Sequence, residues 1–138
     1  MLLVLLAVAV LFGAVIIRST DGNDKPVRVD LVPGAAGAVL FRFSYCDGRG
    51  IPVLHLVEVF HPGDVNREEC AISRENGPYR PVPEWRLGAP MAGFRIRGCE
   101  SLPPGDYRVS VLGPGQSGTT TFRISSGGSV TQTSRPCG

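Results

Sequence analysis

The chain has 138 residues, a formal net charge of +2 at neutral pH and four cysteines. So small a positive charge does not support binding to nucleic acid, and we exclude that class. Residues 1–17 are apolar or small throughout, and removing them from 138 leaves 121, which suffices for one ordinary domain but not for two.

The apolar run of residues 1–17 predicts either a membrane anchor or a cleaved signal peptide. As a helix it would reach about 25 Å, which is marginal for a bilayer core about 30 Å thick. The best nearby cleavage site, Thr20-Asp21-Gly22, is poor, so we expect one uncleaved hydrophobic helix that tethers the chain to a membrane. The basic residues Arg18, Lys25 and Arg28 oppose this topology, because basic flanks favour the cytoplasmic side.

A polar linker over residues 18–26 precedes the predicted domain, residues 27–138. Apolar residues there recur at every second position in short stretches between glycines and prolines, which is typical of antiparallel strands. We predict no helix in the domain. The alternating apolar sets are Val27, Val29 and Leu31; Val39, Phe41, Phe43 and Tyr45; Phe94 and Ile96; Tyr107, Val109 and Val111; and Phe122 and Ile124.

Other stretches alternate less clearly. Residues 51–60 are apolar on both faces and predict a central strand, joined to the strand before it by a tight, glycine-rich hairpin at residues 47–50. Residues 61–83 predict mainly loops, and the single Trp85 is expected to fill the core. Further short strands are expected at residues 70–74, 85–87 and 129–133.

The strongest local signature is LPPGDYRVSV at residues 102–111, a turn followed by a strand whose first inward residue is Tyr107. It predicts a tyrosine corner, in which the ring is buried and the hydroxyl bonds a backbone group a few residues upstream. Together with about seven to nine short strands, it favours an all-β fold: an antiparallel two-sheet sandwich of immunoglobulin-like type, preceded by one N-terminal hydrophobic helix.

This segment resembles the L-x-P-G-x-Y stretch of fibronectin type III, carboxypeptidase-regulatory-like and related bacterial immunoglobulin-like domains. The resemblance covers only residues 102–124. It implies a β-sandwich scaffold and adhesive or accessory work. Such scaffolds have many roles, so the resemblance implies no particular activity.

The cysteines Cys46, Cys70, Cys99 and Cys137 are even in number and include no C-x-x-C pair of the kind found in zinc or redox sites. Because the N-terminus indicates export, we expect disulfides in an oxidising compartment rather than four free thiols. Three pairings are possible. We prefer Cys46 with Cys70 and Cys99 with Cys137, since the second bond would hold a polar C-terminal tail that otherwise frays.

No catalytic or metal-binding signature stands out. Ser117 in the stretch GQSG, with His55 or His61 as base, is the only candidate dyad, but a glycine-rich turn is expected there anyway. His55, His61, Asp64, Glu68 and Glu69 form the only dense group of possible metal ligands, and their spacing matches no known metal loop. We predict no enzyme activity, no metal and no cofactor.

The arginines Arg95, Arg97, Arg108 and Arg123 alternate with inward apolar residues in the C-terminal half. If their strands are neighbours, the outer face of the sheet has a basic patch suited to an anionic glycan, lipid headgroups or an acidic envelope protein. The competing interpretation is a solvated sheet face whose arginines discourage edge-to-edge pairing.

The sequence therefore predicts a non-catalytic accessory or interaction module of the cell envelope. It would be exported, tethered to a membrane through residues 1–17, and would bind a partner through the sheet face or the loop of residues 61–83. The alternative is a small extracytoplasmic hydrolase, or a hydrolase inhibitor, for which Ser117 would be essential.

Overall fold

The computed structural model describes residues 24–33, 38–64, 67–100 and 102–137. Within these ranges there are nine strands and no helix, which confirms the all-β prediction. The expected N-terminal helix, residues 1–17, lies outside the described residues. The strands are β1 (Lys25–Pro33), β2 (Val39–Tyr45), β3 (Leu56–Phe60), β4 (Glu68–Arg74), β5 (Glu84–Arg86), β6 (Phe94–Gly98), β7 (Gly105–Gly113), β8 (Gln116–Ile124) and β9 (Val130–Gln132).

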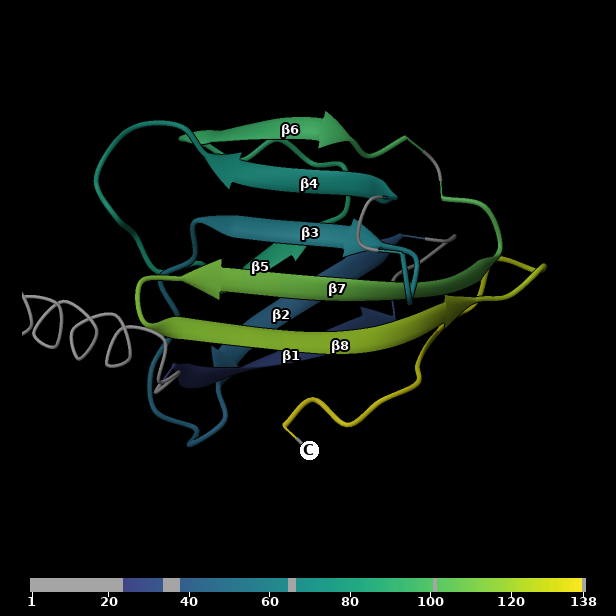
Figure 1. Cartoon of the computed structure of the whole chain (residues 1–138), viewed down its shortest axis with the longest axis horizontal. Helices are drawn as coiled ribbons and strands as arrows, with labels where there is room; N and C mark the ends of the chain where they lie inside the picture. The colour runs from purple at the N-terminus through teal and green to yellow at the C-terminus, as the bar shows by residue number, and fades with distance from the viewer. Residues whose placement is uncertain (1–23, 34–37, 65–66, 101, 138) are drawn as a thin grey trace, which may run out of the picture.

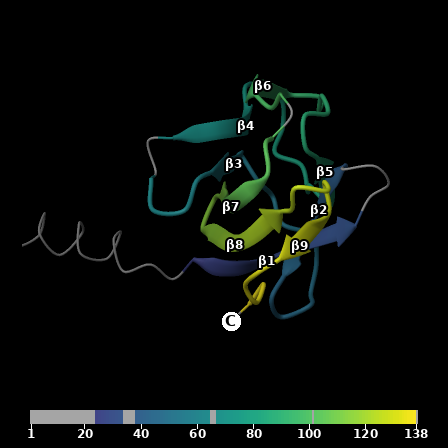
Figure 2. The same ribbon diagram turned by 90° about the vertical axis from the view of Figure 1, so that its right-hand side faces the viewer.

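The strands follow one hydrogen-bonded path, β5-β2-β1-β8-β7-β3-β4-β6, with β9 added to β8. Figure 1 shows β6 at one margin of this path, and Figure 2 shows the path curling round from β6 through β7 and β8 to β2 and β5. The pairings are antiparallel except that of β1 with β8, which is parallel at Lys25 and Pro26. The fold is a curled mixed sheet, and the predicted pair of separate immunoglobulin-like sheets is not confirmed.

The parallel contact between β1 and β8 depends on a glycine. A Cβ at Gly118 would overlap the carbonyl oxygen of Val27. Since only glycine lacks a Cβ, Gly118 lets the two backbones approach closely enough for the sheet to continue from β8 into β1.

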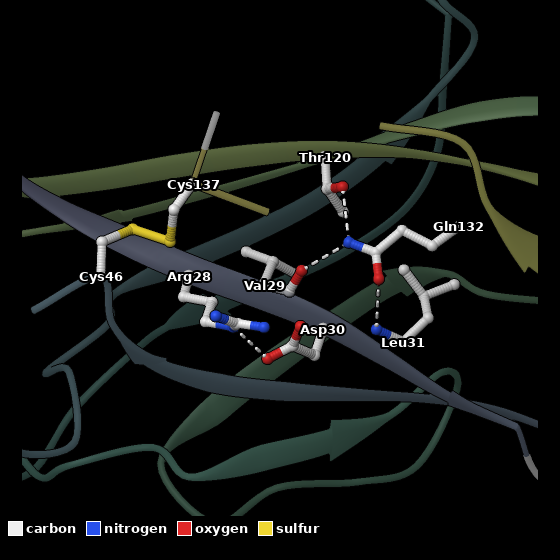
Figure 3. A network of polar contacts seen from close by, with 8 residues as sticks. All are labelled: Arg28, Val29, Asp30, Leu31, Cys46, Thr120, Gln132 and Cys137. Carbon is white, nitrogen blue, oxygen red and sulfur yellow. Dashed lines mark hydrogen bonds and ion pairs between the residues drawn. A yellow bond between two sulfur atoms is a disulfide. The ribbon is translucent and has the colours of Figure 1, made fainter. Parts of the chain in front are cut away.

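Beyond Pro26 the two strands diverge, and the gap is filled by a side chain from β9. The amide nitrogen of Gln132 donates to the carbonyl of Val29 and to Oγ1 of Thr120, both at 2.9 Å, and its oxygen accepts from the N–H of Leu31 at 3.3 Å. Figure 3 shows this amide lying against the β1 backbone, as a peptide group of a neighbouring strand would. Two backbone groups on this edge of β1 are therefore hydrogen-bonded, although no described strand pairs with the edge beyond Pro26.

The inner face of the curl is the core. Trp85 is 2% exposed, stacks on Phe41 with ring centroids 6.1 Å apart, and donates from Nε1 to the carbonyl of Ala89. It fills the core as predicted. The other large side chains that are almost fully buried are Phe41, Leu54, Ile72, Tyr107, Phe122 and the valines at positions 27, 29, 57, 59, 109 and 111.

Two local predictions were wrong. Residues 47–50 do not form a hairpin between paired strands, because β2 pairs with β1 and β5 while β3 pairs with β4 and β7. The glycine-rich turn between β7 and β8 is also shorter than expected: Gly113 pairs with Gln116, so Ser117 already lies within β8.

The preferred disulfide pairing was also wrong. The structure joins Cys46 to Cys137 and Cys70 to Cys99, and no cysteine among the described residues is free. Cys46 follows β2, where its N–H bonds the carbonyl of Pro26, and the chain after β9 returns to this point along β8. The tail is held as predicted, but by the first cysteine rather than the third.

Candidate binding surfaces

Tyr107 has the hydrogen bond predicted for a tyrosine corner. Its hydroxyl donates to the carbonyl of Pro103 at 2.5 Å, four residues upstream, and its side chain is fully buried. The ring stacks on Phe122 with centroids 5.5 Å apart and lies 5.1 Å from the ring of His61. Burial is the main reason that the pKa of Tyr107 is raised. We assign this residue a structural role.

The four predicted arginines do not form one continuous patch. Arg95 and Arg97 are on β6, whereas Arg108 and Arg123 are on β7 and β8, with β3 and β4 between the two pairs of residues. All four arginines lie on the outward face of the sheet, because in each strand they alternate with residues that point towards the core.

Carboxylates neutralise three of these arginines. Arg95 lies 2.7 Å from Glu75, Arg97 lies 3.4 Å from Glu68, and Arg123 lies 2.7 Å from Asp106. Arg108 instead lies over the ring of Phe60, 6.0 Å from its centroid. A ligand would have to displace a carboxylate at three of the four positions, which weakens this face as a site for anions.

Glu58 lies between the two pairs of arginines, on β3 beside Ser110 of β7 and Ala71 of β4. A hydrogen bond with Glu68, partial burial and the negative charge of Glu68 raise the pKa of Glu58, while Arg97 lowers it. The two neighbouring carboxylates of Glu58 and Glu68 lie beside Arg97 within the sheet face, and they further reduce its positive potential.

The candidate dyad is not assembled in the part of the chain that the structure describes. Ser117, on β8, pairs with Leu112 of β7, and no hydrogen bond among the described residues joins it to a histidine. His61 instead contacts Glu69 at 2.7 Å, and Arg67 lies 3.5 Å from the same carboxylate. Among the residues that the structure describes, no group of three or more His, Cys, Asp or Glu side chains is arranged to hold a metal ion. No helix in the described part of the chain is long and apolar enough to cross a membrane.

A different basic site lies in the loops that follow β4 and precede β6. We call it the loop hollow. Its volume is about 190 Å³, and its walls are Leu54, Arg74, Asn76, Gly77, Pro78, Arg80, Ala92, Gly93 and Phe94. It falls within the loop of residues 61–83 that the sequence nominated for binding, together with the turn before β6.

Arg74 and Arg80 both line the loop hollow, and neither has a carboxylate within ion-pair distance among the described residues. The neighbouring Glu75 is held by Arg95 on the outer face of the sheet. Two arginine residues thus line one small concavity without an ion-pair partner among the described residues, and unpaired arginines attract carboxylate or phosphate groups.

Tyr79 holds one of these arginines in place. The guanidinium of Arg74 lies 3.8 Å from the centroid of the Tyr79 ring, and Tyr79 does not line the hollow itself. Stacking fixes the guanidinium plane and leaves its N–H groups free to donate at the edge. Tyr79 is 59% exposed, so this contact is not explained by the needs of the core.

A second concavity, of about 460 Å³, lies between β8 and the C-terminal tail, where Thr119, Thr120 and Thr121 face residues 134–137. It is wider and more open than the loop hollow. Its lining includes Arg108, which lies over Phe60, and Arg135. The loop hollow is the more enclosed of the two, and enclosure strengthens contacts with charged groups.

Sequence reasoning did not single out Arg74 or Arg80. The available signal was compositional, because residues 76–83 contain an arginine and an aromatic residue but no acid. Only the fold brings Arg74, at the end of β4, beside this segment.

No family model, curated protein or solved structure matches the chain. The resemblance of residues 102–124 to fibronectin type III and related domains therefore stays a prediction.

Proposed function

We propose that the chain is a non-catalytic interaction module of the cell envelope, exported and tethered through residues 1–17, which binds an anionic group of a partner at the loop hollow. The observation that supports this best is the pair Arg74 and Arg80, two arginines that line one concavity and have no carboxylate partner among the described residues. This replaces the sheet face, where carboxylates already occupy most arginines, as the expected binding surface.

Two disulfides support an oxidising location for the domain. Such bonds persist outside the cytoplasm and are rare within it. The Cys70–Cys99 bond also supports the site, because it links β4 to the segment just after β6. β4 and β6 are the two strands beside the hollow. A framework that holds β4 and β6 together limits the ordering cost of binding.

The free energy of binding an anion differs between the ion-paired arginines of the sheet face and the arginines of the loop hollow. An ion-paired arginine such as Arg123 must exchange one carboxylate for another, with little net gain. Arg74 and Arg80 lose only water when an anion binds, and the guanidinium of Arg74 is already fixed by Tyr79. An anion therefore gains more at the loop hollow than at an ion-paired arginine such as Arg123.

The test is site-directed photocross-linking of the full-length protein in intact cells. Tyr79 is replaced by benzoylphenylalanine, which keeps an aromatic ring beside Arg74, and exposed Thr131 on β9 receives the same group as the control position. We expect a discrete adduct from position 79 and none of that mass from position 131.

The double variant Arg74→Gln/Arg80→Gln should abolish the adduct. The matched variant Arg42→Gln/Arg123→Gln removes the same charge from two ion-paired arginines and should leave the adduct unchanged. An adduct that persists in Arg74→Gln/Arg80→Gln, or an equal adduct at position 131, would contradict the proposal.

A further inference from the structure

β6 ends the hydrogen-bonded path, and no described strand pairs with its outer side. Figures 1 and 2 both show it at the margin of the sheet. β6 runs antiparallel to β4, with Ile72 opposite Ile96. The N–H of Glu75 donates to Gly93, and the N–H of Cys99 donates to Glu69.

These bonds fix which peptide groups of β6 are used. Residues 93, 95, 97 and 99 face β4, because peptide groups alternate in direction along a strand. The N–H and C=O groups of Ile96 and Gly98 therefore point to the open side. The N–H of Phe94, at the start of this edge, is not available to a new strand, because it donates to the carbonyl of Met91.

The loop hollow lies at that start of the edge. Phe94, the first residue of β6, lines the hollow and pairs with Arg74. A strand added antiparallel to β6 would run from Gly98 towards Phe94, so its C-terminal end would arrive at the hollow. The open edge of β6 and the hollow lined by Arg74 and Arg80 therefore meet at the same end of β6.

We propose that the partner is a peptide segment that extends the sheet along the open edge of β6 and places its C-terminal carboxylate between Arg74 and Arg80. This inference rests on the proposed function, which it makes specific. Backbone bonds to Ile96 and Gly98 supply affinity without sequence preference, and the carboxylate fixes the register. The planar forks of the two arginines match a carboxylate.

The other walls of the hollow define the last residue of the peptide. Leu54, Ala92 and Phe94 are apolar, and a volume of about 190 Å³ is below the usual range for whole small-molecule sites. A small apolar side chain fits beside the carboxylate, and the amide of Asn76 is the one uncharged polar side chain on the wall. This lining suits a peptide terminus better than a hydroxyl-rich sugar, which needs more hydrogen-bonding side chains.

The test uses the full-length protein in nanodiscs and a library of random hexapeptides immobilised through their N-termini. The library is made twice, with free C-terminal carboxylates and with carboxamides. We expect enrichment of carboxylate peptides that end in a small apolar residue, and binding at least about tenfold weaker for their amides, since one charge-assisted interaction is lost. Arg74→Gln and Arg80→Gln should each weaken binding about tenfold or more, whereas Arg123→Gln should not.

Hydrogen exchange of the bound complex tests the strand addition separately. The amides of Ile96 and Gly98 should become protected, while those of Arg95 and Arg97, already bonded to β4, should not change. Equal binding of carboxylate and amide peptides, no enriched peptide, or unprotected Ile96 and Gly98 would each overturn this inference. The proposed function survives those results if the cross-link at position 79 still depends on Arg74 and Arg80, and fails if it does not.

Discussion

The side-chain amide of Gln132 donates to the carbonyl of Val29 at 2.9 Å, across 103 residues of sequence. The same amide accepts from Leu31, so one side chain satisfies two backbone groups of β1. Gln132 thereby completes the hydrogen bonding of β1 where that strand has parted from β8.

Replacing Gln132 should therefore destabilise the fold more than its half-buried position suggests. We expect Gln132→Ala to lower the free energy of unfolding by about 1–3 kcal/mol, because it leaves partly buried backbone groups unpaired. Urea denaturation of the oxidised protein measures this. Thr131→Ala, at the exposed neighbouring position, is the control and should change stability by no more than about 0.5 kcal/mol. Equal losses for the two variants would show that the Gln132 bonds are not needed.

Tyr107→Phe removes only the hydroxyl that bonds Pro103, and it should cost about 0.5–1.5 kcal/mol of stability. Tyr79→Phe makes the same chemical change at an exposed ring without a hydrogen bond among the described contacts, so it should be neutral. Chemical denaturation of both variants makes the comparison. A neutral Tyr107→Phe would refute the structural role of the corner.

Gly118→Ala tests the close approach of β1 and β8. A Cβ at that position overlaps the Val27 carbonyl, and we expect a loss of about 1–3 kcal/mol as the strands separate. Gly127 has an ordinary φ, and its added Cβ would meet only Ser125 Oγ, at 3.9 Å, so Gly127→Ala is the control. Thermal unfolding should separate the two variants clearly, and similar melting temperatures would contradict the role of Gly118.

Glu58 makes stability depend on pH in a predictable direction. Its pKa is raised in the folded protein, chiefly by the hydrogen bond with Glu68, so its favourable contribution is complete below the unfolded pKa and is lost as the pH rises through the folded pKa. Glu58→Gln should thus stabilise the protein relative to wild type at pH 7, by less than about 1 kcal/mol, and this gain should vanish near pH 4. The exposed Glu100→Gln is the control. Denaturation midpoints of the variants at the two pH values measure this difference. A stability gain of Glu58→Gln that grows towards pH 4 would contradict the predicted direction.

Strand positions could be predicted from the sequence, because apolar residues at every second position are the ones that the sheet buries. In β7, Tyr107, Val109 and Val111 are buried, and the residues between them are not. Residues 51–60 were only half right, since β3 begins at Leu56. Leu54 is buried for another reason: the segment before β3 packs under the loop of residues 81–82, where Val53 bridges to Pro81 and Val82 bonds Pro52.

Strand partners could not be predicted, because they depend on contacts between distant segments. The preferred pairing rested on the need to hold the C-terminal tail, but the tail is held by Cys46, because the chain after β9 returns along β8 towards the end of β2. The predicted hairpin at residues 47–50 failed for the same reason, since β2 and β3 lie on different parts of the path. The same limit hid the loop hollow, because Arg74 and Arg80 meet Phe94 only through the pairing of β4 with β6. The sequence named both the sheet-face arginines and the loop of residues 61–83 as possible binding surfaces, but it did not show that the carboxylate partners of the sheet-face arginines come from elsewhere in the chain.

All of the proposals depend on a domain that folds with two specific disulfides outside the cytoplasm. The most direct test is non-reducing mass spectrometry of the full-length protein from its native cells, alkylated before lysis and digested with trypsin. Arginines separate the four cysteines, so each falls in its own peptide. We predict only the linked pairs Cys46–Cys137 and Cys70–Cys99, in a membrane fraction. Four alkylated thiols, or the pair Cys46–Cys70, would contradict the account.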